Sequence, residues 1–322
     1  MMKIGYHASH EQFTPRALLD YVSRAEKAGF KAVMCSDHVS PWSVRQGQSG
    51  HPWPWLGAAL QATSSMSFGT LSIPGGMRYH PVAIAQNFAT LAQMFPNRFQ
   101  WIAAGSGEAM NETVTGETWP AREERMARMK AGIDMIRKLW RGETITQNDG
   151  PFKAENARIW TLPETPPKIY AAAIGPETAR DAGAWADGLI TVRKDVDTLN
   201  SIISAFREGG GEGKPLALQL QVAWAEDEDT ARTEAHDQWR HTAAGAQPWQ
   251  DFRTPESIDR AAEHVAPENM DEGLFISADP AAHLAHIREH AAFGFDEIYI
   301  HNAARNQAQF IEVFAREVLP SC

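Results

Sequence analysis

The stretch Ala32-Val-Met-Cys-Ser-Asp-His-Val-Ser-Pro-Trp42 decides how the rest of the chain is interpreted. It begins with an unbroken apolar run, which is typical of a buried parallel strand. Asp37 and His38 come next, so they stand where the strand ends and a loop begins. In parallel α/β proteins the carboxyl ends of the strands surround the ligand site. The stretch therefore predicts a reactive loop that carries Asp37, His38 and Trp42.

His38 is the residue of this loop that can exchange a proton near neutral pH. Asp37 is its neighbour, but neighbouring strand residues point to opposite faces. We therefore expect Asp37 to hold a ligand or a backbone group rather than to orient His38. Trp42 would form a flat apolar wall. The alternative for His38 is a hydrogen-bonded structural role at a strand end.

Composition narrows the class of protein. The chain has 322 residues, 43% of them hydrophobic and 22% charged, which is ordinary for a globular protein. Its net charge of −10 argues against a nucleic-acid partner. The apolar runs are too short to span a membrane, and the start of the chain lacks an export signal. Because its two cysteines, Cys35 and Cys322, lie far apart, we expect a reducing, cytoplasmic location.

Tryptophan is unusually frequent, with 11 residues in the chain. Trp42, Trp53 and Trp55 crowd into one region. They could belong to the core, but several indole rings on one loop region also suit a pocket for a planar or apolar ligand.

Segments with the pattern of strands alternate with helical segments along the whole chain. The strands are expected at 3–8, 32–36, 67–73, 99–104, 168–173, 188–192, 216–224 and 297–301. The helices are expected at 14–29, 55–64, 121–141, 196–207, 227–241, 281–293 and 307–318, and from Pro81 and Pro176. This alternation predicts a (β/α)8 TIM barrel formed by residues 1–322 as one domain.

Two segments interrupt the alternation and are expected to be loop insertions: a hairpin at 144–159 and the irregular stretch 243–279, with a possible helix at 256–264. The alternative fold is an open, doubly wound sheet. Against it, Gly105-Ser-Gly-Glu-Ala-Met110 lacks the third glycine of a nicotinamide-binding turn.

In a barrel, the residues that follow the strands share one mouth. An imidazole and a carboxylate from different strands would suit acid–base chemistry, although Glu108 could instead cap a helix or a loop. Gly175-Pro176 could seat an anion or form an ordinary tight turn. The residues expected at the mouth are His7, His10, Asp37, His38, Trp42, Leu71, Ser72, Pro74, Gly107, Glu108, Asn111, Ala173, Ile174, Gly175, His301 and Asn302.

A metal-dependent hydrolase is the rival interpretation of this set. His7, His10, His38 and Asp37 could bind a metal, with His301 as a further ligand. However, His-x-x-His on a strand end directs its two rings to opposite faces unless the chain bends. We therefore predict no metal in the site.

Several motifs together resemble the bacterial luciferase-like flavin and deazaflavin oxidoreductases, and in particular the deazaflavin-dependent glucose-6-phosphate dehydrogenases. They cover most of the chain. They are Ile4-Gly-Tyr-His-Ala-Ser9 with Glu11-Gln-Phe13, Ser36-Asp-His38 with Pro41-Trp42, Arg78-Tyr79 with Pro81 and Ile84-Ala-Gln86, Pro96-Asn-Arg98, Gly107-Glu-Ala109 with Asn111-Glu112 and Gly116, and Asp187-Gly188.

The resemblance implies a TIM barrel, a homodimer and an oxidoreductase that acts on a small molecule. It implies that His38 is the acid–base residue, that Trp42 shapes the face where substrate meets the cofactor, and that Glu108 donates a proton near the cofactor ring. The residues that it implies in cofactor binding are Asp37, Leu71, Ser72, Gly107, Asn111, Ala173, Ile174, Gly175 and Val192.

The chain also departs from that subfamily. Val192 and Asp195 stand where its sugar-phosphate site has Thr and Lys, and Trp249 and Gly273 stand where it has Lys and Arg. A phosphate dianion would meet almost no positive charge there, so we exclude glucose 6-phosphate as substrate. The chain resembles still more closely a sister group that uses ordinary flavin, and Pro74, which stands in place of a threonine near the deazaflavin, fits this. We therefore favour FMN over the deazaflavin coenzyme F420.

Two reactions are compatible with these residues. His38 could take a hydroxyl proton during hydride transfer, or move protons while reduced FMN activates dioxygen. In either reaction, the polar loop 45–50 could close over the site. A flavin-binding protein without turnover is a further alternative.

Overall fold

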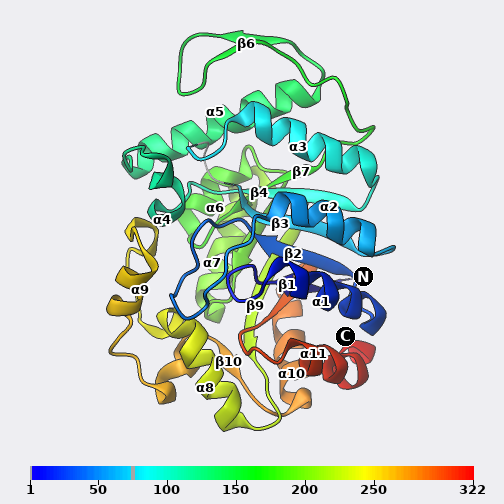
Figure 1. The fold of residues 1–322 in the computed structure, drawn as a ribbon, viewed down its shortest axis with the longest axis vertical. Helices are drawn as coiled ribbons and strands as arrows, with labels where there is room; N and C mark the ends of the chain where they lie inside the picture. The colour runs from blue at the N-terminus through cyan, green and yellow to red at the C-terminus, as the bar shows by residue number, and fades with distance from the viewer. Residues whose placement is uncertain (1, 74–76) are drawn as a thin grey trace.

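The computed structural model describes residues 2–73 and 77–322, and within them eight parallel strands close into a barrel (Figure 1). Strand β9 pairs with β8 on one side and β11 on the other, which closes the ring. The predicted TIM barrel is confirmed. In spatial order the strands are β1 (Lys3–Ala8), β2 (Ala32–Ser36), β3 (Ser67–Ile73), β4 (Phe99–Ala104), β7 (Lys168–Ala172), β8 (Gly188–Val192), β9 (Leu216–Ala223) and β11 (Glu297–Asn302).

Helices cover the outside of the barrel (Figure 1). Several begin with proline, whose fixed φ and missing N–H suit the first turn of a helix. The main helices are α1 (Pro15–Ala28), α2 (Pro52–Ala62), α3 (Pro81–Met94), α5 (Arg122–Trp140), α6 (Pro176–Gly183), α7 (Val196–Phe206), α8 (Glu228–Trp239), α10 (Pro280–Ala291) and α11 (Gln307–Val313).

The start of α2 differs from the prediction. The helix expected from Trp55 begins at Pro52, because His51 accepts a hydrogen bond from the backbone N–H of Trp53 and caps the helix earlier. Thr14 caps α1, since its hydroxyl accepts from the backbone N–H of Ala17.

Both predicted insertions are present. Strands β5 (Ile145–Gln147) and β6 (Ala154–Ala157) form the hairpin, which projects beyond α5 in Figure 1. The second insertion contains α9 (Pro255–Ala261) and the short strand β10 (Phe275–Ile276), which pairs with the carboxyl end of β9. Its buried residues form an apolar cluster with residues of β9 and α8, among them Trp239, and the partly buried Trp42 packs against this cluster.

Three large rings fill the amino-terminal part of the barrel. Trp101 stacks on Tyr170 with ring centroids 5.2 Å apart, and Tyr299 meets Trp101 edge-on at 5.8 Å. Each ring faces a glycine, where an added Cβ would lie within 2.1–2.6 Å of ring atoms. The rings and their facing glycines are Trp101 and Gly69, Tyr299 and Gly5, and Tyr170 and Gly188.

Glu297 satisfies the polar atoms of this aromatic floor. Its carboxylate accepts from Trp101 Nε1 at 3.1 Å, from the Tyr299 hydroxyl at 2.6 Å and from Lys3 Nζ at 3.0 Å. The floor confines any ligand site to the opposite end of the barrel.

Candidate active site

His38 lies between two carboxylates at the mouth of the barrel. Its Nδ1 is 2.6 Å from Glu11 Oε1, and its Nε2 is 3.3 Å from Glu108 Oε2. Glu11 follows β1, His38 follows β2, and Glu108 precedes the short helix α4 (Ala109–Glu112) after β4. The imidazole is 12% exposed. Three loops therefore assemble a carboxylate–imidazole–carboxylate arrangement that suits proton transfer.

Glu11 is the functional residue that sequence reasoning missed, since it appeared there only within a family motif. It is buried and accepts hydrogen bonds from the hydroxyls of Ser9 and Ser36. Burial would raise the pKa of Glu11, but the hydrogen bond and charge of His38 lower it well below its usual range. Glu11 therefore stays ionised and fixes the Nδ1 side of His38.

The two carboxylates also set the protonation state of His38. Burial alone would lower the pKa of His38, but the charge of Glu108 together with the hydrogen bond and charge of Glu11 raises it to about 9. At neutral pH the imidazole carries both protons in this arrangement. His38 can therefore act as an acid at neutral pH and as a base only at alkaline pH.

Trp42 meets His38 edge-on, with ring centroids 5.5 Å apart, and stacks on His241 at 5.4 Å. Trp249 meets His241 edge-on, with ring centroids 5.7 Å apart. Burial lowers the pKa of His241 to about 4, so this imidazole is neutral. The three side chains Trp42, His241 and Trp249 form an uncharged aromatic wall. His241 lies at the end of a predicted helix without any motif, and sequence reasoning did not select it.

Asp37 points away from His38, as expected. Its carboxylate accepts from Arg78 Nη2 at 2.8 Å, from the Tyr79 hydroxyl at 3.1 Å and from Trp53 Nε1 at 2.9 Å. The side chain is buried among these partners. Asp37 thus anchors the loop after β2 to the loop after β3, and its contact with a cofactor stays a prediction.

Asn111 joins the loops after β2 and β4. Its Oδ1 accepts from the backbone N–H groups of Val39 and Ser40, and its Nδ2 donates to Glu108 Oε2 at 2.7 Å. Glu108 stands at the N-cap position of α4 but makes no capping hydrogen bond, so the alternative of a helix cap is wrong. Gly107 before it has a φ of 81°, which favours glycine.

The other predicted cofactor residues lie at the ends of β3, β7 and β8. Leu71 and Val192 are half-buried, and Ile174 is 64% exposed. Ala173 and Gly175 complete a small, uncharged turn before α6. These surroundings fit a planar heteroaromatic ring, which needs apolar contact and little charge. The side chain of Ser72, and all of Pro74, lie outside the described residues.

The rival metal set does not converge. His10 Nδ1 lies 2.8 Å from the carbonyl oxygen of Gly50. The rings of His7 and His301 contact each other, with centroids 4.4 Å apart. In the described part of the chain, the side chains spaced to hold a metal ion lie on α10 and include none of the histidines at the mouth.

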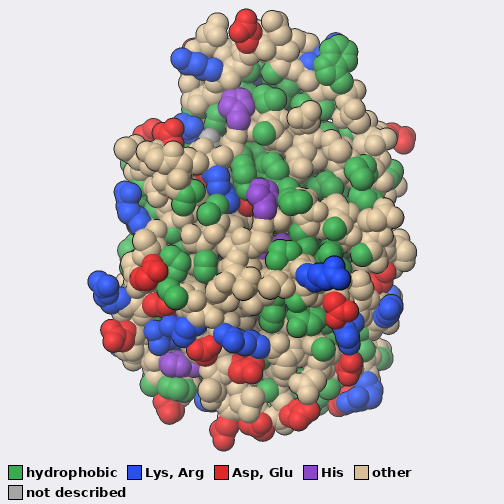
Figure 2. All heavy atoms as spheres, in the orientation of Figure 1, with side chains coloured by type: hydrophobic (Ala, Val, Ile, Leu, Met, Phe, Trp, Pro, Cys, Tyr) green, Lys and Arg blue, Asp and Glu red, His purple; other side chains and the backbone are tan. Residues whose placement is uncertain are grey.

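The surface gives two further findings. In Figure 2, acidic and basic side chains are interspersed on the visible face rather than gathered into one basic patch. Within residues 2–73 and 77–322, every helix is too short or too polar to cross a membrane.

Comparison with known protein families shows to which family the chain belongs. The model of the luciferase-like monooxygenase family matches residues 2–297, and the chain belongs to this family. It is thus a luciferase-like oxidoreductase, as the resemblance predicted.

Individual proteins of known sequence or structure are similar to this chain to different degrees. The chain is 36% identical to the F420-dependent glucose-6-phosphate dehydrogenase of Beutenbergia cavernae, over 99% of this chain and 97% of that one. An F420-dependent secondary alcohol dehydrogenase in complex with an F420–acetone adduct superposes with a TM-score of 0.92 and 31% identity, covering 100% of this chain and 99% of that one. An FMN complex of the oxygenating constituent of a Pseudomonas putida diketocamphane monooxygenase shares the fold alone, with a TM-score of 0.72, 16% identity and coverage of 99% and 98%.

These findings bear on two sequence-based predictions. The more similar relatives carry F420 in their names, so the preference for FMN is not supported. The exclusion of glucose 6-phosphate is not confirmed either, because relatives that are 36% and 34% identical are named F420-dependent glucose-6-phosphate dehydrogenases.

Proposed function

We propose that this protein is an F420-dependent dehydrogenase of a small, uncharged secondary alcohol, or a reductase of the corresponding ketone. The observation that carries the proposal is His38 held between Glu11 and Glu108 at the barrel mouth. A second support is the likeness to the F420-dependent secondary alcohol dehydrogenase over the whole chain.

In this reaction His38 exchanges a proton with the oxygen of the substrate. Glu11 holds Nδ1, so the Nε2 proton, which faces Glu108, is the one that can move. In the direction of ketone reduction, Nε2 donates its proton to the carbonyl oxygen. In the direction of alcohol oxidation, the deprotonated Nε2 accepts the hydroxyl proton. The deazaflavin, when bound, supplies or takes up the hydride.

The chain would seat the cofactor ring on uncharged residues. Leu71, Val192 and the turn Ala173–Gly175 would contact the ring, while Gly107 allows the chain to approach it closely. The aromatic wall would then lie on the substrate side, because Trp42 also contacts His38.

Charge supports an uncharged substrate rather than glucose 6-phosphate. Glu11 and Glu108 flank His38 and would repel an anion. Arg78, whose charge acts on His38, is paired with Asp37. Arg45, whose charge acts on His241, is paired with Asp259. Both guanidinium groups are thus already paired with carboxylates, which weakens their attraction for a phosphate group.

The test is to titrate the purified chain with F420 and, separately, with FMN, while following protein and cofactor fluorescence. F420 reduction is then measured with 2-propanol, cyclohexanol and glucose 6-phosphate as donors. We expect F420 binding and reduction by the uncharged alcohols. Reduction by glucose 6-phosphate alone would overturn the substrate class, and binding of FMN alone would overturn the cofactor.

A matched pair of variants separates chemistry from binding. His38→Asn should bind F420 like the wild type but lose turnover, whereas His264→Asn, at an exposed histidine, should change neither property. Equal turnover of His38→Asn and wild type would reject the proposed role of His38.

A further inference from the structure

Helix α10 carries the sequence His286-Ile-Arg-Glu-His290 on its second half. Residues three and four apart lie on the same face of a helix, so the spacing brings His286, Glu289 and His290 together. Histidines at this spacing with a carboxylate beside one of them occur in zinc sites, but the spacing alone is a weak signal. The three-dimensional arrangement adds the stronger argument.

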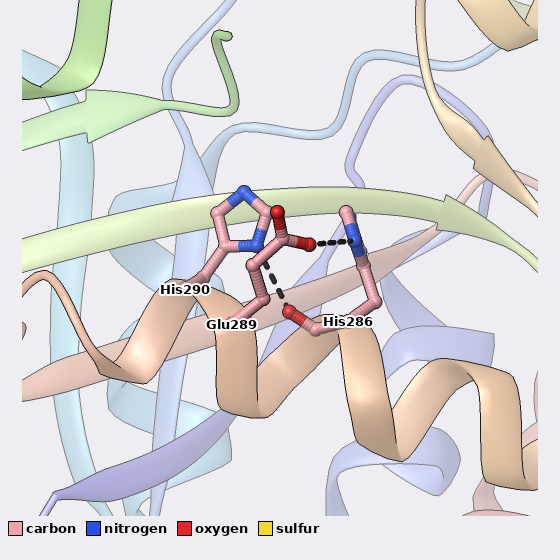
Figure 3. A group of neighbouring side chains, drawn as sticks. All are labelled: His286, Glu289 and His290. Carbon is pink, nitrogen blue, oxygen red and sulfur yellow. Dashed lines mark hydrogen bonds and ion pairs between the residues drawn. The ribbon is translucent and has the colours of Figure 1, made fainter. Parts of the chain in front are cut away.

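Figure 3 shows the carboxylate of Glu289 between the rings of His286 and His290. One potential ligand atom from each lies within 4.8 Å of the other two. His286 Nδ1 is 3.4 Å from a Glu289 carboxylate oxygen, so an imidazole nitrogen and a carboxylate already share one position in space.

Both imidazoles are oriented by groups around them. His290 Nδ1 donates to the carbonyl oxygen of His286 at 2.9 Å, so the backbone fixes the orientation of this ring. A backbone carbonyl in this role is a common support for a metal-binding histidine. The His286 ring stacks on Phe275 at 4.2 Å, and its buried Nε2 lacks a hydrogen-bond partner within the described chain.

The electrostatics favour the metal-binding form of both histidines. Burial first, and then the charges of His290 and Arg193, lower the pKa of His286 to about 3. Burial likewise lowers the pKa of His290. Burial thus shifts both rings toward the unprotonated form, which a metal ligand must have. Arg193 opposes a bound cation, and Glu289 offsets it with the opposite charge.

We propose that His286, Glu289 and His290 bind one divalent transition-metal ion on the outside of the barrel. Two imidazoles and one carboxylate suit Zn²⁺ or Co²⁺ rather than Mg²⁺ or Ca²⁺, which prefer oxygen ligands. Water would complete the coordination shell on the exposed side, where Glu289 is 56% exposed. The ion clamps the last turns of α10 and takes no part in the redox reaction at His38.

The experiment is isothermal titration of the chelator-treated full chain with Zn²⁺ at pH 7.5, followed by Co²⁺ binding observed in the visible spectrum. We expect one site per chain, a rise in the unfolding temperature with Zn²⁺, and weak Co²⁺ bands typical of nitrogen and oxygen ligands. His290→Gln should weaken Zn²⁺ binding by at least about tenfold. Glu289→Gln should weaken it as well, and because that side chain is exposed, this variant tests the site without disturbing the fold.

His264→Gln is the matched control, because it removes an exposed histidine from another part of the chain. It should leave Zn²⁺ affinity unchanged. The proposal is rejected if the wild type binds no Zn²⁺, or if Glu289→Gln and His290→Gln bind it as tightly as the His264→Gln control. F420 binding measured in the same samples reports separately on the proposed redox function.

Discussion

The two sides of the barrel mouth shift the pKa of a histidine in opposite directions. His38 sits on the side formed by the loops after β1, β2 and β4, where Glu11 and Glu108 raise its pKa to about 9. His241 sits on the side formed by the segment after α8, among indole rings, where burial lowers its pKa to about 4. Burial lowers the pKa of both imidazoles, and the adjacent carboxylates Glu108 and Glu11 outweigh burial only at His38. A proton-carrying side therefore faces an uncharged, apolar side.

The largest expected effect comes from breaking the charged side at its centre. His38→Asn removes the group that exchanges the proton, and loss of a general acid or base typically costs about 10²- to 10⁴-fold in rate. We expect that loss in kcat/KM, measured by cofactor absorbance, with F420 affinity little changed. His241→Asn is the matched change on the aromatic side and should retain most of the rate; an equal loss in both variants would contradict the contrast.

The next effect tests how the charged side sets the pKa of His38. In the wild type, alcohol oxidation should rise with pH with a midpoint near pH 9, because Nε2 must first lose its proton. Glu11→Gln removes one of the negative charges that raise this pKa, so the midpoint of the pH profile should move to lower pH. An unchanged midpoint would mean that Glu11 does not control the protonation of His38.

The pairing of His38 with Glu11 also predicts how the stability of the fold depends on pH. The raised pKa of His38 means that its pairing stabilises the fold fully below the unfolded-state pKa of about 6.5 and that this contribution is lost as pH rises through about 9. Wild type should therefore lose more stability than Glu11→Gln between pH 7 and pH 10, as measured by urea unfolding. Parallel losses in the two proteins would argue against a buried charged pair.

A smaller effect is expected on the aromatic side. Trp249→Ala removes apolar area from the wall, and contacts of this kind are worth about 1–3 kcal/mol in substrate discrimination. The KM for cyclohexanol should rise more than the KM for 2-propanol, with kcat nearly constant. A uniform fall in kcat for both alcohols would place Trp249 outside the substrate contact.

The smallest effect concerns the link between the two sides. Arg45 donates to the Asp237 carbonyl at 2.6 Å and to Asp259 at 2.9 Å, so the loop that was expected to close over the site is tied to the aromatic side. Partly exposed ion pairs contribute about 1 kcal/mol or less. Arg45→Met should lower the unfolding temperature by a few degrees at most, and a loss of turnover as large as that of His38→Asn would contradict this.

The barrel could be predicted from the sequence because each strand is a short apolar run followed by polar or glycine residues and then a helix start. The elements β2 and β8, for example, have the bounds that their apolar runs indicate. The first turn of α2 was missed because a histidine cap, His51, is not among the strong capping residues.

The site was only partly predictable for a physical reason. His38, Trp42 and Glu108 stand directly after strands, so the position of the strand ends locates them. Glu11 acts on His38 across 27 positions of sequence, and its carboxylate has no local pattern that distinguishes it from a surface residue. His241 comes from an irregular segment whose path depends on tertiary packing, so no periodicity could bring it to Trp42.

The aromatic floor of the barrel has a consequence for the order of events in turnover. Because Trp101, Tyr170 and Tyr299 close one end, cofactor and substrate must enter and leave through the same opening. Whichever partner lies deeper must arrive first and depart last. We therefore expect sequential, ordered steady-state kinetics, in which the late-binding partner at high concentration traps the other inside.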